Sequence, residues 1–130
     1  MAAIYLDSSA IVKLAVREPE SDALRGYLRT RRPRVSSALA RAEVMRALLH
    51  QGDSARKAGR RALAGLDLLR IDNRVLDIAG GLLPVELRTL DAIHLATAQR
   101  LGTELARVCT YDDRMRDAAE RLGLSVIAPC

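Results

Sequence analysis

Residues 3–16, AIYLDSSAIVKLAV, contain the pattern that decides the fold. Ala3–Asp7 (AIYLD) is a short strand-like run of apolar residues, and residues 8–16 (SSAIVKLAV) follow it directly as a short helix. Short apolar strands that lead into helices are typical of α/β domains, in which a parallel sheet is covered on both faces. Such sheets place their sites at the carboxyl ends of the strands. Asp7, which ends the first strand, is therefore the first candidate for chemistry.

The same alternation of strands and helices continues along the chain, and no linker, repeat or low-complexity tract interrupts it. We therefore expect residues 1–130 to form a single α/β domain with a short, mostly parallel sheet. The predicted strands are Ala3–Asp7, Val35–Ser37, Arg107–Tyr111 and Ser125–Ala128, with a further short strand at Arg70–Asp72. The predicted helices are 8–16, Pro19–Thr30, Ala38–Gln51, Ser54–Leu69, Val75–Leu83, Leu90–Leu101 and Asp112–Leu122.

Composition excludes several classes of protein. A chain of 130 residues can bury one real core, and 49% hydrophobic with 28% charged residues excludes disorder and a membrane-embedded protein. Two cysteines, Cys109 and Cys130, are too few for a disulfide scaffold or a four-ligand zinc site. No apolar run approaches the ~20 residues of a membrane span, and no cleavable leader is visible, so we expect a cytoplasmic protein without a membrane partner.

The charge of the chain suggests what it binds. The net charge is +5, and 19 of the 21 basic residues are arginine, whose planar fork suits phosphate. A genome that prefers arginine to lysine is the alternative explanation. With three tyrosines as the only aromatic residues, base stacking is disfavoured, so any nucleic acid would be held by its backbone. Two basic sets could provide that grip or could simply be solvated: Arg31, Arg32 and Arg34, and Arg56, Lys57, Arg60 and Arg61.

Two acidic positions follow predicted strands. Asp7 follows the first strand, and Asp112 with its neighbour Asp113 follows Arg107–Tyr111. Each could act only as a helix N-cap, because a carboxylate accepts hydrogen bonds from the free N–H groups at that position. Ser8 or Ser9 could cap the first helix equally well, so a cap does not specifically require Asp7.

Two further acids lie on predicted helices. Asp91 lies in LDAIHLATA, where an ionised carboxylate among apolar residues is expensive unless it is paired or bound to a metal. A buried arginine or His94, three residues along, is the alternative partner for it. Glu43 lies at the edge of an apolar stripe in SALARAEVMRALL, where an ordinary surface pair with Arg41 or Arg46 is the alternative.

The combination of these acids carries the argument. Two stand at the carboxyl ends of strands, and two stand on helices that should pack near those ends. Carboxylates gathered in this way repel one another, and two divalent cations would neutralise a cluster of about four charges. Oxygen-only ligands favour Mg²⁺ or Mn²⁺ over zinc. Metal-dependent hydrolysis of a phosphodiester is the reaction that this cluster would suit.

At these residues the chain resembles the PIN-domain ribonucleases, in particular the VapC toxins of bacterial type II toxin–antitoxin systems. The matching segments are IYLDSSAIVKL, SSALARAEVMRAL, LDAIHLATAQRLG and VCTYDDRMRDAAERLGLSVIAP, which together span nearly the whole chain in the order of the family. The resemblance implies a three-layer α/β/α fold and an endoribonuclease that depends on Mg²⁺ or Mn²⁺.

The resemblance also implies roles for individual residues. The acidic, metal-binding residues of the family correspond to Asp7, Glu43, Asp91 and Asp112, with Asp113 as a further possible ligand and with Ser9 and Thr110 as polar supports. His94 matches a common family residue, for which helix packing or orientation of a neighbour is the expected role.

The resemblance implies partners as well: an RNA substrate such as tRNA or rRNA, a neutralising VapB-type antitoxin, and a second copy of the chain in a homodimer. A PIN module that binds RNA or a protein without cutting is the alternative function. A phosphatase or phosphoacceptor domain that uses Asp7 as nucleophile is disfavoured, because the DxDx[TV] pattern is absent: position 9 is Ser.

Overall fold

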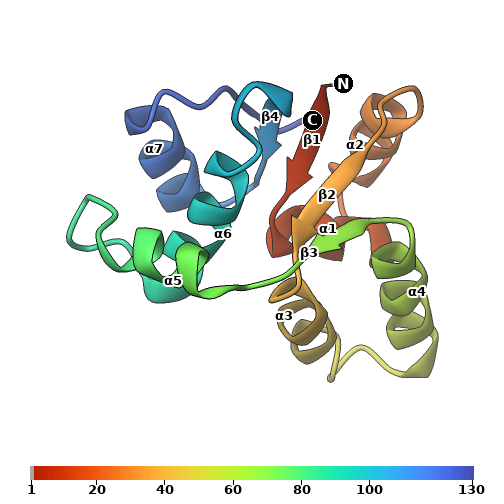
Figure 1. Ribbon diagram of the computed structural model, residues 1–130. Helices are drawn as coiled ribbons and strands as arrows, with labels where there is room; N and C mark the ends of the chain where they lie inside the picture. Colours follow the sequence, from red (N-terminus) through yellow and green to blue (C-terminus); the bar gives the residue numbers. More distant parts are fainter. Residues whose placement is uncertain (1) are drawn as a thin grey trace.

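The computed structural model describes residues 2–130 and shows one sheet with helices packed on both of its faces (Figure 1). The strands lie in the order β3-β2-β1-β4-β5, and every pairing between neighbours is parallel. The predicted parallel sheet is thus confirmed. The strands are β1 (Ala3–Leu6), β2 (Arg34–Ser37), β3 (Asp67–Leu69), β4 (Leu105–Cys109) and β5 (Val126–Ile127).

The helices form the two outer layers. On one face Ile4 and Leu6 pack into a core with α1 (Ser8–Ala15), α2 (Ser21–Leu28), α3 (Ala40–Ala47) and α4 (Asp53–Ala64). On the other face lie α5 (Asn73–Gly80), α6 (Thr89–Gln99) and α7 (Asp113–Arg121), and the short 3-10 helix η1 (Gly102–Glu104) leads from α6 into β4. The expected three-layer α/β/α arrangement is therefore confirmed.

Burial on both faces explains why the first strand is apolar at every position. The β1 residues are all buried, because alternate side chains point to opposite faces and both faces are covered.

Cys109, predicted to be a small core residue, is fully buried at the end of β4. Burial raises the pKa of its thiol to about 12, and the charge of Asp7 adds to the effect. Within residues 2–130, no helix has the length and apolar character needed to cross a membrane.

The prediction was wrong around residues 65–72. The helix predicted for Ser54–Leu69 ends at Ala64, and Asp67–Leu69 forms edge strand β3, paired with β2. The strand predicted at Arg70–Asp72 is absent, and Asp72 instead caps α5. A strand of three residues is too short to show a period of its own. It forms because Leu66, the residue before it, is buried in the core and the edge of β2 supplies hydrogen-bond partners.

Elsewhere only the ends of the elements differ from the prediction. Helix α3 ends at Ala47, four residues before the predicted Gln51, and β4 covers Leu105–Cys109 rather than Arg107–Tyr111. Consequently Thr110 and Tyr111 lie after the strand, in the turn that leads to α7. This turn, together with the junction between β1 and α1, forms the floor of the site described next.

Candidate active site

The site lies at the carboxyl ends of β1 and β4, which are neighbours at the centre of the sheet. Leu6 pairs with Cys109 at the last register position of the two strands. From β1 the chain builds β2 and β3 on one side and then crosses to build β4 and β5 on the other, so the switch in strand order falls between β1 and β4. Ligands of open parallel sheets bind at such a switch point. Asp7 follows one of these strands, and Asp112 follows the other.

Asp7 is the most deeply buried acid of the site, with 3% of its surface exposed. It is the N-cap of α1: Oδ1 accepts hydrogen bonds from the backbone N–H of Ala10 at 3.1 Å and from the Ser9 hydroxyl at 2.6 Å. Oδ2 accepts from the Thr110 hydroxyl at 2.5 Å. Burial raises the pKa of Asp7, although these three donors oppose the shift. Capping therefore explains the contact with Ala10 but not the two additional hydroxyl donors.

Ser9 and Thr110 connect the two strand ends through Asp7. While donating to Asp7, the Ser9 oxygen accepts from the backbone N–H of Tyr111 at 3.0 Å. The Thr110 oxygen in turn accepts from the backbone N–H of Asp112 at 3.1 Å. Each hydroxyl proton is thus directed toward the Asp7 carboxylate. Ser9 and Thr110 therefore both hold the Asp7 carboxylate in position by hydrogen bonds.

Glu43 is held by a buried polar network that the sequence did not reveal. One of its oxygens, Oε1, accepts from the Ser8 hydroxyl at 2.5 Å and lies 2.6 Å from Nε2 of His94. The other ring nitrogen of His94, Nδ1, lies 2.6 Å from the hydroxyl oxygen of Tyr5. Burial pushes the pKa of Glu43 upward, but the hydrogen bonds from His94 and Ser8 outweigh it, and the net shift is downward. Glu43 is therefore an ionised acceptor at neutral pH.

This network replaces two alternatives from the sequence. Within residues 2–130, Glu43 forms no ion pair with Arg41 or Arg46, and His94 bonds Glu43 rather than Asp91. The only sequence signal was that His94 shares a helical face with Asp91. No local pattern connects it to Glu43, which lies 51 positions away.

Asp91 lies in the first turn of α6 and is half-buried. Its side chain makes no hydrogen bond or ion pair within the described part of the chain. Burial raises its pKa, the charges of Asp112 and Asp7 raise it further, and those of His94 and Arg88 oppose the shift. The negative charges of Asp7 and Asp112 are therefore among those that disfavour ionisation of Asp91.

The remaining two acids differ from each other. Asp112 caps α7: its Oδ1 accepts from the backbone N–H groups of Arg114 at 2.8 Å and Met115 at 3.2 Å, so Oδ2 is not used by the cap. Asp113 points outward, with 86% of its side chain exposed, and forms an ion pair with Arg116 at 3.0 Å. The structure thus places Asp7 and Asp112 after neighbouring strands and connects them through the Thr110 hydroxyl. Asp113 stays at the surface.

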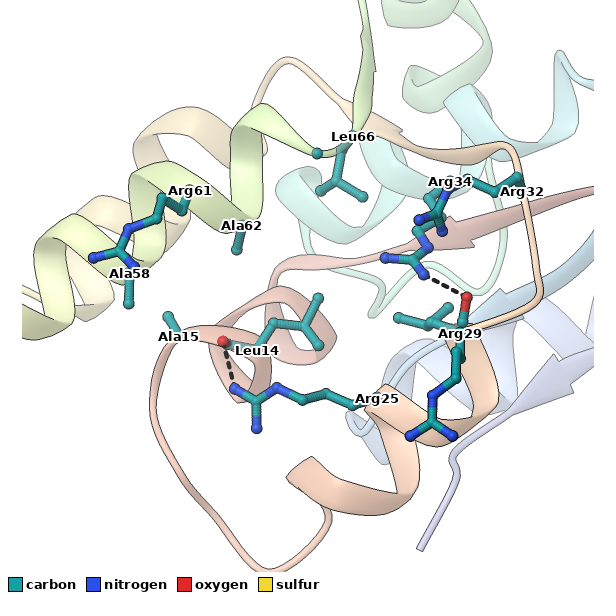
Figure 2. Close-up of a pocket in the computed structure, with 12 residues that line it drawn as sticks. Leu14, Ala15, Arg25, Arg29, Arg32, Arg34, Ala58, Arg61, Ala62 and Leu66 are labelled. Carbon is teal, nitrogen blue, oxygen red and sulfur yellow. Dashed lines mark hydrogen bonds between the residues drawn. The ribbon is translucent and has the colours of Figure 1, made fainter.

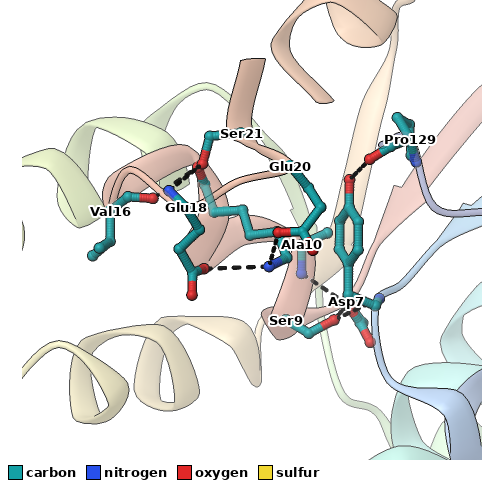
Figure 3. A network of polar contacts seen from close by, with 10 residues as sticks. Asp7, Ser9, Ala10, Val16, Glu18, Glu20, Ser21 and Pro129 are labelled. Carbon is teal, nitrogen blue, oxygen red and sulfur yellow. Dashed lines mark hydrogen bonds and ion pairs between the residues drawn. The ribbon is translucent and has the colours of Figure 1, made fainter. Parts of the chain in front are cut away.

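Basic side chains do not neutralise this group of acids. Within residues 2–130, no lysine or arginine forms an ion pair with Asp7, Glu43, Asp91 or Asp112. Lys13 lies over the ring of Tyr111, with Nζ 4.7 Å from the ring centroid, but its ammonium group bonds Glu20 at 2.9 Å and Glu18 at 3.4 Å. Figure 3 shows these two glutamates in one view with Asp7 and Ser9.

The donor set fits a hard divalent cation by its chemistry. All four candidate ligands are carboxylates, and a cation would relieve the raised pKa of Asp7 and Asp91. The side chains do not form a closed cage: in the described residues, no three His, Cys, Asp or Glu side chains converge closely enough to hold a metal ion. A bound cation would therefore have to draw the carboxylates together or keep several water ligands, as Mg²⁺ usually does.

Comparison with known proteins identifies the protein family of the chain. The sequence profile of the PIN domain matches residues 4–121, and the chain belongs to the PIN-domain family. Within that family it groups with the VapC ribonucleases. Ribonuclease VapC46 of Mycobacterium tuberculosis (strain ATCC 25618 / H37Rv) is 86% identical over 99% of both chains. Ribonuclease VapC35 of the same species is 44% identical over 97% of this chain and 96% of its own. The family expected from the sequence motifs is confirmed.

Solved structures show the same fold at low sequence identity. The crystal structure of Mycobacterium tuberculosis VapC20, described as a toxin that cleaves the sarcin–ricin loop, superposes with a TM-score of 0.76 at 15% identity. It covers 97% of this chain and 99% of its own. A toxin–antitoxin complex from Klebsiella pneumoniae gives a TM-score of 0.74 at 22% identity over 98% of both chains.

Proposed function

We propose that this protein, with residues 1–130 as a single PIN domain, is an endoribonuclease that depends on Mg²⁺ or Mn²⁺ and acts as the toxin of a type II toxin–antitoxin system. One observation carries the proposal: the buried or half-buried carboxylates at the switch point of the sheet form no ion pair with a lysine or arginine within residues 2–130, and two of them, Asp7 and Asp91, have raised pKa values. The high identity to a VapC ribonuclease supports the same conclusion.

In this proposal Asp7, Glu43, Asp91 and Asp112 hold the cation. When bound, Mg²⁺ or Mn²⁺ supplies the Lewis acid that activates water for in-line attack and stabilises the leaving oxygen of the phosphodiester. The hydroxyl groups of Ser9 and Thr110 orient the Asp7 carboxylate and oppose the rise of its pKa, since both donate to it. His94 and Ser8 donate to the same oxygen of Glu43, which leaves its second oxygen free of these contacts.

The contacts of Ser8 argue against a serine nucleophile. Ser8 lies 3.4 Å from Nε2 of His94, which superficially resembles a serine–histidine pair. The Ser8 hydroxyl proton, however, points to Glu43 at 2.5 Å, and the same Nε2 is already bonded to Glu43. With Tyr5 on the opposite ring nitrogen, His94 has no free lone pair to accept the Ser8 proton.

The test is cleavage of total RNA by purified, antitoxin-free protein. Discrete fragments should form with Mg²⁺ or Mn²⁺ and should be lost both in EDTA and in the Asp91→Ala variant. Asp113→Ala is the matched control, because it removes a neighbouring acid that accepts none of the cap hydrogen bonds and whose side chain is exposed to solvent. Absence of cleavage with either metal, from protein shown to be folded, would leave the second candidate, a PIN module that binds without cutting. That candidate is favoured by the lack of three converging ligands.

The proposal includes partners of three kinds. The substrate is a structured RNA of translation, tRNA or rRNA, which places the protein in the cytoplasm. A VapB-type antitoxin is the neutralising partner, and the Klebsiella toxin–antitoxin complex supports such a partner by its fold.

The third partner is a second copy of the chain. Exposed apolar side chains cluster on α5, on the segment before α6 and on the start of α6: Leu76, Leu83, Val85 and Leu90. A hollow of about 510 Å³ lies among the same elements. Val85 is 85% exposed, which is unfavourable in water unless another surface covers it. We therefore place the homodimer contact on this patch.

A further inference from the structure

A basic groove lies between α2 and α4, beyond the end of α1 that is farther from Asp7 (Figure 2). It has a volume of about 680 Å³ and a floor that includes Leu14, Leu28 and Leu66. Its charged lining consists of arginine alone, without any acidic residue. These five residues define the basic groove: Arg25, Arg29, Arg32, Arg34 and Arg61.

None of the five guanidinium groups has a carboxylate partner within residues 2–130. Two of them are fixed by backbone carbonyls, as the dashed lines in Figure 2 show: Arg25 donates to Leu14 at 2.8 Å, and Arg34 donates to Leu28. A carbonyl orients a guanidinium group but does not cancel its charge. Burial lowers the pKa of Arg34, and the neighbouring charge of Arg32 lowers it further.

Tertiary structure brings these arginines together from separate parts of the sequence. Arg32 and Arg34 belong to one basic set recognised in the sequence, and Arg61 belongs to the other. Folding places these three arginines on one groove, beside Arg25 of α2 and Arg29, which follows α2 directly. Like charges repel, so this arrangement is most favourable when an anion is bound. Arginine offers two parallel N–H donors, a geometry that matches phosphate.

We propose that the basic groove binds the phosphodiester backbone of the RNA substrate, away from the bond that is cut. This inference rests on the proposed ribonuclease function. Helix α1 connects the two places: Asp7 caps its start, and Leu14 and Ala15 at its end line the groove. Eight helical residues rise about 12 Å, so one RNA could reach both places with a few nucleotides between them. The groove lining contains no aromatic residue, so recognition there is through phosphates and not through stacked bases.

Salt dependence of RNA binding tests this directly. We would measure binding of a fluorescein-labelled single-stranded 20-nucleotide RNA of mixed sequence by anisotropy, in EDTA so that no cleavage occurs. The groove variant carries Arg29→Ala, Arg32→Ala and Arg61→Ala, all at exposed positions. Each lost phosphate contact lowers the slope of log affinity against log salt by about 0.7, so the three changes should lower it by about 2.

A matched control variant removes the same charge elsewhere. Arg60→Ala, Arg70→Ala and Arg74→Ala are also exposed and lie outside the groove lining. This variant should keep a slope within about 0.5 of wild type, because it loses no phosphate contact. Circular dichroism and urea unfolding verify that both variants fold. With Mg²⁺ or Mn²⁺, the groove variant should show a raised KM with kcat within about twofold, since uniform binding is lost.

Several results would overturn the groove proposal. Equal changes of slope in the two triple variants would mean that RNA is attracted by the overall positive charge and not by the groove. No detectable RNA binding by wild type would exclude the groove as an RNA site. If the groove variant keeps RNA binding but loses binding of a glutamate-rich amphipathic peptide, the groove is a protein-docking surface. Because affinity is measured without metal, failure of the groove and failure of the nuclease proposal are distinguishable.

Discussion

Removing the hydrogen bond between Tyr5 and His94 should show how much this buried contact beneath Glu43 contributes to the free energy of unfolding. Both residues are almost fully buried, at 1% and 2% exposed, and their polar atoms lie 2.6 Å apart. Glu43 is an ionised acceptor, so we assign the His94 proton to Nε2, and Nδ1 then accepts from the Tyr5 hydroxyl. Within residues 2–130 this is the one hydrogen bond that either atom makes.

The expected magnitudes follow from the groups left unpaired. Tyr5→Phe leaves Nδ1 of His94 without a donor and should lower the free energy of unfolding by about 1–3 kcal/mol. His94→Leu leaves the Tyr5 hydroxyl unpaired and also removes the charge-assisted bond to Glu43, for a loss of about 3–5 kcal/mol. In the double variant neither unpaired group remains, so its loss should be smaller than the sum of the single losses by about 2 kcal/mol or more.

Urea unfolding in EDTA at neutral pH measures all four proteins of this cycle. Tyr27→Phe is the control, because the Tyr27 hydroxyl makes no hydrogen bond within residues 2–130, and its change should stay within about 0.5 kcal/mol. Its ring stacks with Arg31, 4.0 Å from centroid to guanidinium carbon, and phenylalanine keeps that contact. Single losses that add to within about 0.5 kcal/mol in the double variant would refute the reasoning, since they would show that the two groups do not depend on each other.

Four further predictions concern charge, metal, assembly and thiols. The pKa of Asp91 is raised in the folded protein, so the unfolded chain loses this proton at a lower pH than the folded chain does. As pH rises from about 4 through the folded pKa, the free energy of unfolding of wild type should therefore fall relative to that of Asp91→Asn. Parallel curves of unfolding free energy against pH would contradict this. Mg²⁺ at a hundred times its Kd should raise the unfolding free energy of wild type by about 2.7 kcal/mol, and much less in Asp7→Asn, as thermal melts with and without EDTA would show. Val85→Glu should shift the protein from dimer to monomer in light scattering after size exclusion, and an unchanged mass would exclude the patch. A thiol reagent should label Cys130 alone in the native protein and also Cys109 after unfolding, because only Cys130 is exposed.

Local sequence predicted the elements whose residues carry their own signal. The apolar run of β1, the helix after it and the acids that follow β1 and β4 are visible as neighbours in the chain, because strand, turn and cap are decided over a few residues. Edge strand β3 was missed for the opposite reason. Its three residues carry no periodicity, and only pairing with β2 makes them a strand.

The site, too, was predicted in part from the sequence and decided in part by tertiary structure. The sequence alone predicted the parallel α/β class and the family, and it proposed four acids, Asp7, Glu43, Asp91 and Asp112, as ligands of a hard cation, because residue type and position in a strand–helix pattern are local facts. Tertiary structure alone decided that His94 bonds Glu43, 51 positions away, that Thr110 bonds Asp7, 103 positions away, and that Asp113 faces solvent. Hydrogen bonds act over about 3 Å, and only the packing of helices on the sheet brings distant residues within that reach.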